Sequence, residues 1–213
     1  MSSASPVLPF RGLILDFVGV LTAPVGPPLR RWCVDQGLPA HAWGHVLGRH
    51  PEGRRLYREL EAGRLGQAEW NRLTALLLGV DEHVDLMGRA WARVQPAVEM
   101  VELARLARRA GVRTALLSNS FGRDPYDPYR VLGVAGLCEV EVLSEVEGLA
   151  KPDPEIYRRT LDRMGLDGGE CVFVDDRAEN LSPAAELGIT VVHADSSPGT
   201  AGRVAGLLGL PGG

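Results

Sequence analysis

An aspartate at the end of an apolar run is the residue around which chemistry can be organised in this sequence. The largely apolar Gly12–Leu15 leads directly into Asp16, and a glycine follows at Gly19. This pattern is typical of a buried parallel strand that ends at the edge where open α/β sheets bind ligands. A buried carboxylate needs a compensating partner, although a hydrated strand end is the alternative interpretation. Segments further along the chain favour a site.

Polar residues follow two other apolar runs, and a lysine lies between alanine and proline. Ser118 and the pair Asp175-Asp176 each end such a run, and Lys151 stands in Ala-Lys-Pro. Group transfer to a carboxylate needs a nucleophile, a counter-charge for the substrate anion and a hydrogen-bond donor. We therefore expect Asp16 to be the nucleophile, Lys151 the counter-charge and Ser118 the donor.

The three aspartates also suggest a metal site. Asp16, Asp175 and Asp176 would form an oxygen-rich group of the kind that Mg²⁺ prefers. The ion would keep Asp16 ionised and reduce its repulsion of a phosphate. The alternative for Asp175-Asp176 is a strand-end turn in which the carboxylate of Asp176 accepts from the next backbone amides.

The elements that must position these residues alternate along the chain. Strand-like runs are expected at 12–15, 112–117, 138–143, 171–174 and 189–192. Helical patterns are expected from Pro96 to Gly111, from Pro154 to Gly165 and from Pro183 to Gly188, with one weak helix at 204–208. This alternation predicts an α/β fold with a doubly wound parallel sheet of about five strands. Right-handed crossovers bring the carboxyl ends of all strands to one edge.

Residues 23–94 interrupt this alternation with helical patterns alone. We expect helices at 29–36, 41–47, 53–61, 67–78 and 82–94, the last capped by Asp81. The chain is thus divided into a first core segment at 1–22, a helical cap at 23–94 and the rest of the core at 95–213. The cap emerges at the edge that carries the polar residues and is positioned to act as a lid. Most of its tryptophans should form its core, and one could face the crevice; they are Trp32, Trp43, Trp70 and Trp91.

Four segments in this order resemble the haloacid dehalogenase-like (HAD) hydrolase superfamily over nearly the whole chain. They are Asp16-Phe17-Val18-Gly19-Val20-Leu21-Thr22, Leu116-Leu117-Ser118-Asn119, Gly148-Leu149-Ala150-Lys151-Pro152-Asp153-Pro154-Glu155-Ile156-Tyr157 and Val172-Phe173-Val174-Asp175-Asp176-Arg177-Ala178-Glu179-Asn180. The resemblance implies a Rossmann-like core with a helical cap after the first segment. It is close to the branch that includes the amino-terminal domain of soluble epoxide hydrolase and the sugar-phosphate phosphatases.

The resemblance also implies roles for the matching residues. Asp16 would attack phosphorus, Ser118 would bind the phosphoryl group, and Lys151 would steady both Asp16 and the phosphate. Asp176 would ligate Mg²⁺ with support from Asp175.

Further roles follow for three neighbouring residues. The backbone carbonyl of Val18 would be a further metal ligand. Asn119, next to Ser118, is placed with the substrate-binding residues, although it could instead organise the surrounding loops, as Asn180 could.

Val18 departs from the family pattern. Most phosphatases of the family carry a second Asp two residues after the nucleophile, which protonates the leaving group and later deprotonates water. A valine supplies no such group, and positioned acid–base help is worth about 10²–10⁴ in rate. We therefore expect slow turnover, or a leaving group that needs no proton.

Three function classes remain open at this point. The first is a Mg²⁺-dependent phosphatase of a small phosphorylated metabolite, acting through an aspartyl-phosphate. The second is a 2-haloacid dehalogenase, whose branch also lacks the second Asp but usually has an aromatic residue there and no metal. The third is a phosphometabolite-binding or regulatory protein that has lost turnover.

Composition excludes several other classes of protein. The formal charge of −4 comes without a basic block, so we expect no nucleic-acid partner, and no apolar run reaches the length of a membrane span. The three cysteines are far apart and the start of the chain does not resemble a secretion signal, which predicts a reducing cytoplasm. The i, i+4 pair His41 and His45 could ligate a metal, but a solvated helix face is the preferred interpretation.

Overall fold

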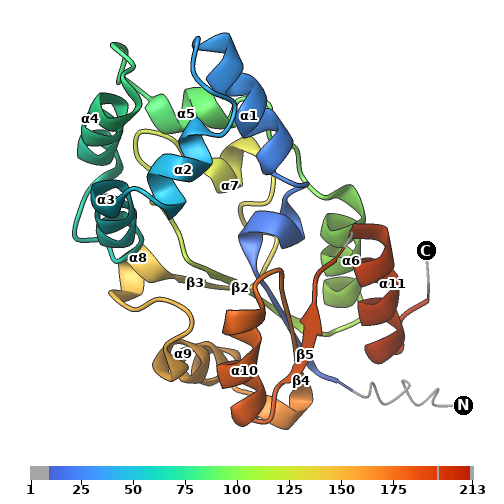
Figure 1. Ribbon diagram of the computed structural model, residues 1–213. Helices are drawn as coiled ribbons and strands as arrows, with labels where there is room; N and C mark the ends of the chain where they lie inside the picture. The colour runs from blue at the N-terminus through green and yellow to red at the C-terminus, as the bar shows by residue number, and fades with distance from the viewer. Residues whose placement is uncertain (1–9, 196, 212–213) are drawn as a thin grey trace, which may run out of the picture.

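A five-stranded parallel sheet forms the centre of the molecule. The computed structural model describes residues 10–195 and 197–211. The strands lie in the order β3-β2-β1-β4-β5 (Figure 1). Their bounds are Gly12–Leu15 (β1), Arg113–Ser118 (β2), Val140–Leu143 (β3), Cys171–Asp175 (β4) and Thr190–His193 (β5). The predicted α/β fold is confirmed, although β3 begins two residues later than expected.

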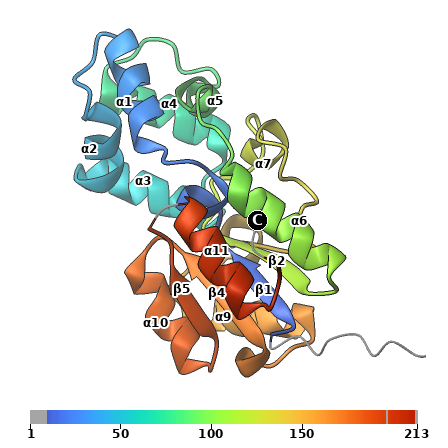
Figure 2. The same cartoon turned by 90° about the vertical axis from the view of Figure 1, so that its right-hand side faces the viewer.

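Helices cover both faces of the sheet. On one face α6 (Val98–Arg109) packs beside α11 (Ser197–Leu207), as Figure 2 shows, and on the other lie α9 (Pro154–Met164) and α10 (Ala178–Glu186). The central strand β1 is buried on both faces, because Leu13 and Leu15 join the apolar cluster around α6 whereas Ile14 joins the cluster around α9. Such two-sided burial explains its continuous apolar sequence.

The last residue of β1 is paired with both neighbouring strands. Leu15 is paired with Leu116 on one side and with Val174 on the other. The backbone N–H of Asp16 donates to the carbonyl of Val174 at 2.9 Å. Asp16 is therefore held at the end of β1, beside the residues that end β2 and β4.

The cap is inserted after β1 and a short irregular helix, η1 (Phe17–Leu21). Its helices are α1 (Gly26–Asp35), α2 (Ala42–Gly48), α3 (Pro51–Glu61), α4 (Gln67–Leu78) and α5 (Leu86–Trp91), which lie above the carboxyl edge of the sheet (Figure 1). The chain leaves and re-enters the core through paired segments. Thr22 forms an antiparallel bridge with Pro96, the N–H of Ala23 donates to Gln95, and that of Ala97 donates to Leu21.

The cap tryptophans are all buried, but they have different roles in packing. Trp43 lies in edge contact with both Trp32 and Trp70, at ring-centroid distances of 5.4 Å and 5.9 Å. Trp91 instead stacks on Phe17 at 6.2 Å and contacts Phe121, both of which belong to the core. Three tryptophans thus form the core of the cap, and the fourth packs the cap against the sheet domain.

The last cap helix was predicted too long and with the wrong cap. α5 begins at Leu86, and its first turn is capped by Asp85, whose carboxylate accepts from the N–H of Gly88. Asp85 has a left-handed φ of 48°, so residues before it cannot continue the helix. Asp81 therefore does not cap it.

Two core helices also differ from the sequence pattern. α10 begins at Ala178 and contains Pro183, because the carboxylate of Asp175 accepts from the N–H of Arg177 and closes the turn directly after β4. α11 begins at Ser197, well before the weak pattern at 204–208. Four short helices were not predicted: η1, α7 (Pro128–Val131), α8 (Ser144–Glu147) and η2 (Gly168–Glu170).

Candidate active site

A buried lysine joins two of the aspartates at the carboxyl edge of the sheet. The Lys151 ammonium donates to Asp16 Oδ1 at 2.6 Å, to Asp175 Oδ2 at 2.6 Å and to the carbonyl of Leu117 at 2.9 Å. All its donors are used, and the side chain is only 1% exposed. The loop before α9, the end of β1 and the end of β4 therefore meet at one ammonium group.

The side chain of Asn119 holds this loop in place. Its amide nitrogen donates to the carbonyl of Lys151 at 2.9 Å, and its oxygen accepts from the N–H of Lys151 at 2.8 Å. Both polar atoms of the Asn119 amide bond the backbone of Lys151. This arrangement agrees with the alternative in which Asn119 organises the surrounding loops. A direct role in substrate binding stays a prediction.

Asp175 and Asp176 lie in different environments. Asp175 is fully buried, and besides Lys151 it accepts from the N–H of Arg177 and from the amide of Asn180. Asp176 is exposed and follows the strand. Its carboxylate lies against Gly19, where a Cβ atom would come within 2.5 Å of Asp176 Oδ2 and where φ is +79°. A glycine at this position therefore allows the Asp176 carboxylate to approach the end of β1.

One ammonium group cannot neutralise three carboxylates. Burial raises the pKa of Asp16 well above its usual range, against the opposing charge of Lys151, and the nearby Asp175 raises it further. Burial also raises the pKa of Asp176, as does Asp175. For Lys151, burial would lower the pKa, but the two aspartates outweigh it and the pKa is raised. The site carries an excess of negative charge beside a permanently charged lysine.

This excess of negative charge fits a divalent cation. Asp16, Asp175 and Asp176 can each offer an oxygen such that the three oxygens lie within 4.8 Å of one another. Carboxylate oxygens are hard ligands suited to Mg²⁺, and a cation there would relieve the repulsion that raises the pKa values. The oxygens of Asp175 are already occupied by donors, which suits it to a supporting position. Val18 lies in η1, two residues after Asp16, and ligation by its carbonyl stays a prediction.

Ser118 ends β2 with its side chain buried in the same region. Its hydroxyl accepts from the hydroxyl of Tyr129 at 3.1 Å, and the ring of Tyr129 packs on Phe17 at 4.5 Å. Tyr126 and Tyr129 are both buried, so the loop that carries them packs against the core. Sequence analysis did not connect Tyr129 with Ser118.

Two residues of α3 were not among the site residues predicted from the sequence. The charge of Asp16 acts on both Tyr57 and Glu61, which lie one turn apart on this cap helix. Burial raises the pKa of Glu61 to about 7, while Arg177 and Lys151 lower it and Asp16 raises it. Their i, i+4 spacing was the only signal in the sequence, and it is common on helices.

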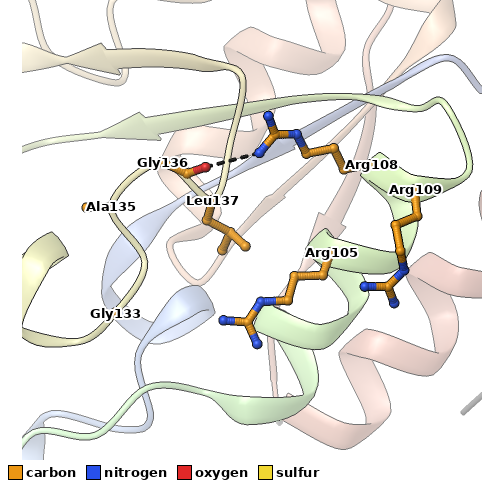
Figure 3. Close-up of a pocket in the computed structure, with 7 residues that line it drawn as sticks. All are labelled: Arg105, Arg108, Arg109, Gly133, Ala135, Gly136 and Leu137. Atoms are coloured by element: carbon orange, nitrogen blue, oxygen red, sulfur yellow. Dashed lines mark hydrogen bonds between the residues drawn. The ribbon is translucent and has the colours of Figure 1, made fainter.

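The histidine pair, the cysteines and a surface pocket give weaker evidence for a functional site than the three aspartates do. His41 and His45 face each other at 6.4 Å, but among residues 10–195 and 197–211 the three aspartates form the one group of potential metal ligands. All three cysteines are buried and unpaired. A surface pocket lined by Arg105, Arg108 and Arg109 lies between α6 and residues 133–137 (Figure 3). Arg105 is paired with Glu102, and Arg108 donates to Gly136. None of the three aspartates lines this pocket, so it is separate from their cluster.

The model of the haloacid dehalogenase-like hydrolase family matches residues 10–188. The chain belongs to this family. A phosphoglycolate phosphatase from Cupriavidus necator is 30% identical to this hydrolase over 88% of the chain and 82% of the relative. The bifunctional epoxide hydrolase 2 of Sus scrofa is 30% identical over 44% of the chain, which confirms the expected branch. Four curated relatives at 28–34% identity are covered over only 10–59% of their own length.

A solved structure agrees with the fold of this hydrolase. A HAD family enzyme from Bacteroides thetaiotaomicron, solved as a magnesium complex, superimposes with a TM-score of 0.67 at 24% identity, covering 87% of this chain and 93% of the other. This similarity supports the Rossmann-like core and cap. Within the described ranges, none of the helices of this hydrolase has the length and apolar character needed to cross a membrane.

Proposed function

We propose that this hydrolase is a Mg²⁺-dependent phosphatase that acts on a small phosphorylated metabolite through an aspartyl-phosphate on Asp16. The observation that carries the proposal is the buried contact of Lys151 with Asp16 at 2.6 Å, beside the exposed carboxylate of Asp176. This arrangement holds an anionic nucleophile next to a cation that can also attract a phosphate. The phosphoglycolate phosphatase relative supports the same reaction class.

Each side chain has a defined part in this reaction. Asp16 Oδ2, the oxygen that Lys151 does not bind, would attack phosphorus, while Oδ1 stays oriented by the ammonium group. Ser118 would contact the phosphoryl oxygens, and the charge of Lys151 would attract them. The hydrogen bond from Tyr129 orients the serine hydroxyl. Asp16 and Asp176, with the carbonyl of Val18, would hold Mg²⁺, which supplies charge neutralisation for the approaching phosphate.

The test is a panel of phosphorylated metabolites with and without Mg²⁺. Phosphate release should require Mg²⁺ and should stop on addition of EDTA. Asp16→Asn controls for contaminating phosphatases and should have no activity. A 2-haloacid in the same panel tests the dehalogenase alternative. Full activity in EDTA, or halide release without phosphate release, would contradict the proposal.

A further inference from the structure

The end of cap helix α3 is fastened to the core beside the substrate-binding loop. The hydroxyl of Ser144 donates to the backbone carbonyl of Glu61 and accepts from the N–H of Ser120 at 2.9 Å. Gly63, just past the helix, lies so close to the carbonyl of Glu145 that a Cβ atom would come within 2.2 Å of it. The position of Glu61 is therefore fixed relative to the loop that follows Ser118.

The carboxyl group of Glu61 has no hydrogen-bond or ion-pair partner within the part of the chain that the structure describes, although the residue is partly buried. The charged groups that act on it are Arg177, Lys151 and Asp16, which come from the ends of β4 and β1 and from the loop before α9. A carboxyl group that is partly buried, unpaired and influenced by the charge of Asp16 is available to interact with a substrate atom.

The neighbouring ionisable groups are Glu147, Tyr57 and Glu145, and each is affected by an arginine or by burial. Glu147 of α8 is paired with Arg159 and Arg163, and Tyr57 stays neutral because burial raises its pKa. Burial also raises the pKa of Glu145, whose charge interacts with Arg123. The pKa of about 7 allows Glu61 to hold or release a proton near neutral pH.

In most phosphatases of the family, the residue two positions after the nucleophile is the general acid and base. In this chain that residue is Val18, which cannot transfer a proton. Val18 is partly buried against apolar neighbours and has no ionisable group. We propose that Glu61, supplied by the cap, is the general acid and base of this phosphatase. This role rests on the proposed function and assigns the proton transfers to a residue of the cap that lies within the electrostatic influence of Asp16.

Glu61 gives up one proton in the first step of the reaction and regains one in the second. In the first, Asp16 attacks phosphorus, the bond from phosphorus to the ester oxygen breaks, and Glu61 gives its proton to that oxygen, so an alcohol leaves. In the second, water attacks the phosphorus of the aspartyl-phosphate and gives a proton to the Glu61 carboxylate. The bond from phosphorus to Asp16 then breaks, phosphate leaves, and both residues return to their starting forms.

The test compares Glu61→Gln with wild type on an alkyl phosphate and on p-nitrophenyl phosphate. Glutamine has nearly the same shape but cannot exchange the proton, so kcat for the alkyl ester should fall about 10²–10⁴-fold with little change in KM. With p-nitrophenyl phosphate, a burst of nitrophenol should remain, followed by slow phosphate release. The limb of the pH profile near pH 7 that belongs to Glu61 should disappear. Adding Val18→Asp to Glu61→Gln should restore part of the lost rate.

Glu59→Gln is the matched control, because Glu59 lies on the same helix but is paired with Arg64. It should behave as wild type. An unchanged kcat and pH profile in Glu61→Gln would overturn the assignment, as would a change in KM alone, which would indicate substrate binding. If wild type releases neither alcohol nor phosphate from any ester, the proposed function fails and this role fails with it. An active wild type with an equally active Glu61→Gln refutes only the role of Glu61.

Discussion

Lys151 is a single ammonium group between two buried carboxylates, and this arrangement sets both the chemistry and the stability of the site. Asp16 is kept oriented but is not fully neutralised, because Asp175 competes for the same charge. A buried ion pair of this kind contributes little net stability when complete, but removal of one partner leaves an uncompensated charge. The site therefore depends on all three groups being present.

Lys151→Met should destabilise the protein by about 3–5 kcal/mol, because Asp16 and Asp175 would lose their shared counter-charge in the interior. Urea denaturation at pH 7.5 measures the change. Arg55→Ala, which breaks the exposed pair with Glu52, is the control and should leave stability nearly unchanged. Equal effects of the two substitutions would show that the buried pair is not coupled to folding.

Glu61 should make stability depend on pH in metal-free protein. Its pKa rises from 4.5 to about 7 on folding, so the folded protein binds this proton more tightly than the unfolded chain does. The resulting stability is fully present below about pH 4.5 and is lost as the pH rises through about 7. Relative to Glu61→Gln, wild type should lose about 1–3 kcal/mol across this window. Parallel stability curves for the two proteins, measured by denaturation in EDTA, would contradict the expected burial.

At the scale of elements, the junction of α3 with α8 decides where the cap meets the core. Figure 1 shows α3 directly above α8. The backbone of Gly63 touches that of Glu145, and Ser144 bonds both Glu61 and Ser120. A shift of α3 would therefore move Glu61 and Tyr57 away from Asp16.

Gly63→Ala should slow turnover by about tenfold or more, because the added methyl group would push α3 off the core and misplace Glu61. Gly79→Ala is a close control. Both glycines have left-handed φ angles, +69° and +71°, but nothing lies within 4 Å of a Cβ atom at Gly79. Both variants should lose stability from backbone strain, and only Gly63→Ala should lose activity. Steady-state kinetics beside thermal melts separates the two effects.

At the scale of the whole molecule, the site joins segments that are far apart in the chain. Asp16, Lys151 and Asp176 belong to the start, the middle and the later part of the sequence, and only the folded state brings them together. A ligand that binds this cluster binds the native state alone, so it should stabilise the entire fold.

Mg²⁺ should raise the melting temperature, with a stabilisation of about 2.7 kcal/mol when its concentration is 100 times Kd. Asp176→Asn should abolish most of this effect, because it removes the exposed carboxylate of the cluster. Glu186→Gln, at the far end of α10, removes an exposed carboxylate outside the site and should retain it. Calorimetric melts at several Mg²⁺ concentrations provide the measurement, and an unchanged shift in Asp176→Asn would place the ion elsewhere.

The parts of the site that could be predicted are those at strand ends. Asp16, Ser118 and Asp175 each end a central strand, and the edge on which parallel strands end follows from the order of elements. Glu61 could not be predicted in the same way, because its position depends on how α3 docks on α8. Pro183 misled the placement of α10, because it lies inside the helix and not at its start, where proline is normally tolerated.

The antiparallel bridge between Thr22 and Pro96 has an evolutionary consequence. Because the two connections to the cap run side by side, the ends of the inserted segment are neighbours in space. A segment with adjacent ends can be gained, lost or exchanged in a single genetic event without a change in the order of the strands. If the cap supplies Glu61 as the proton carrier, such an exchange would replace part of the catalytic machinery together with the lid. The substitution at Val18 and the sequence of the cap would then be inherited as one unit.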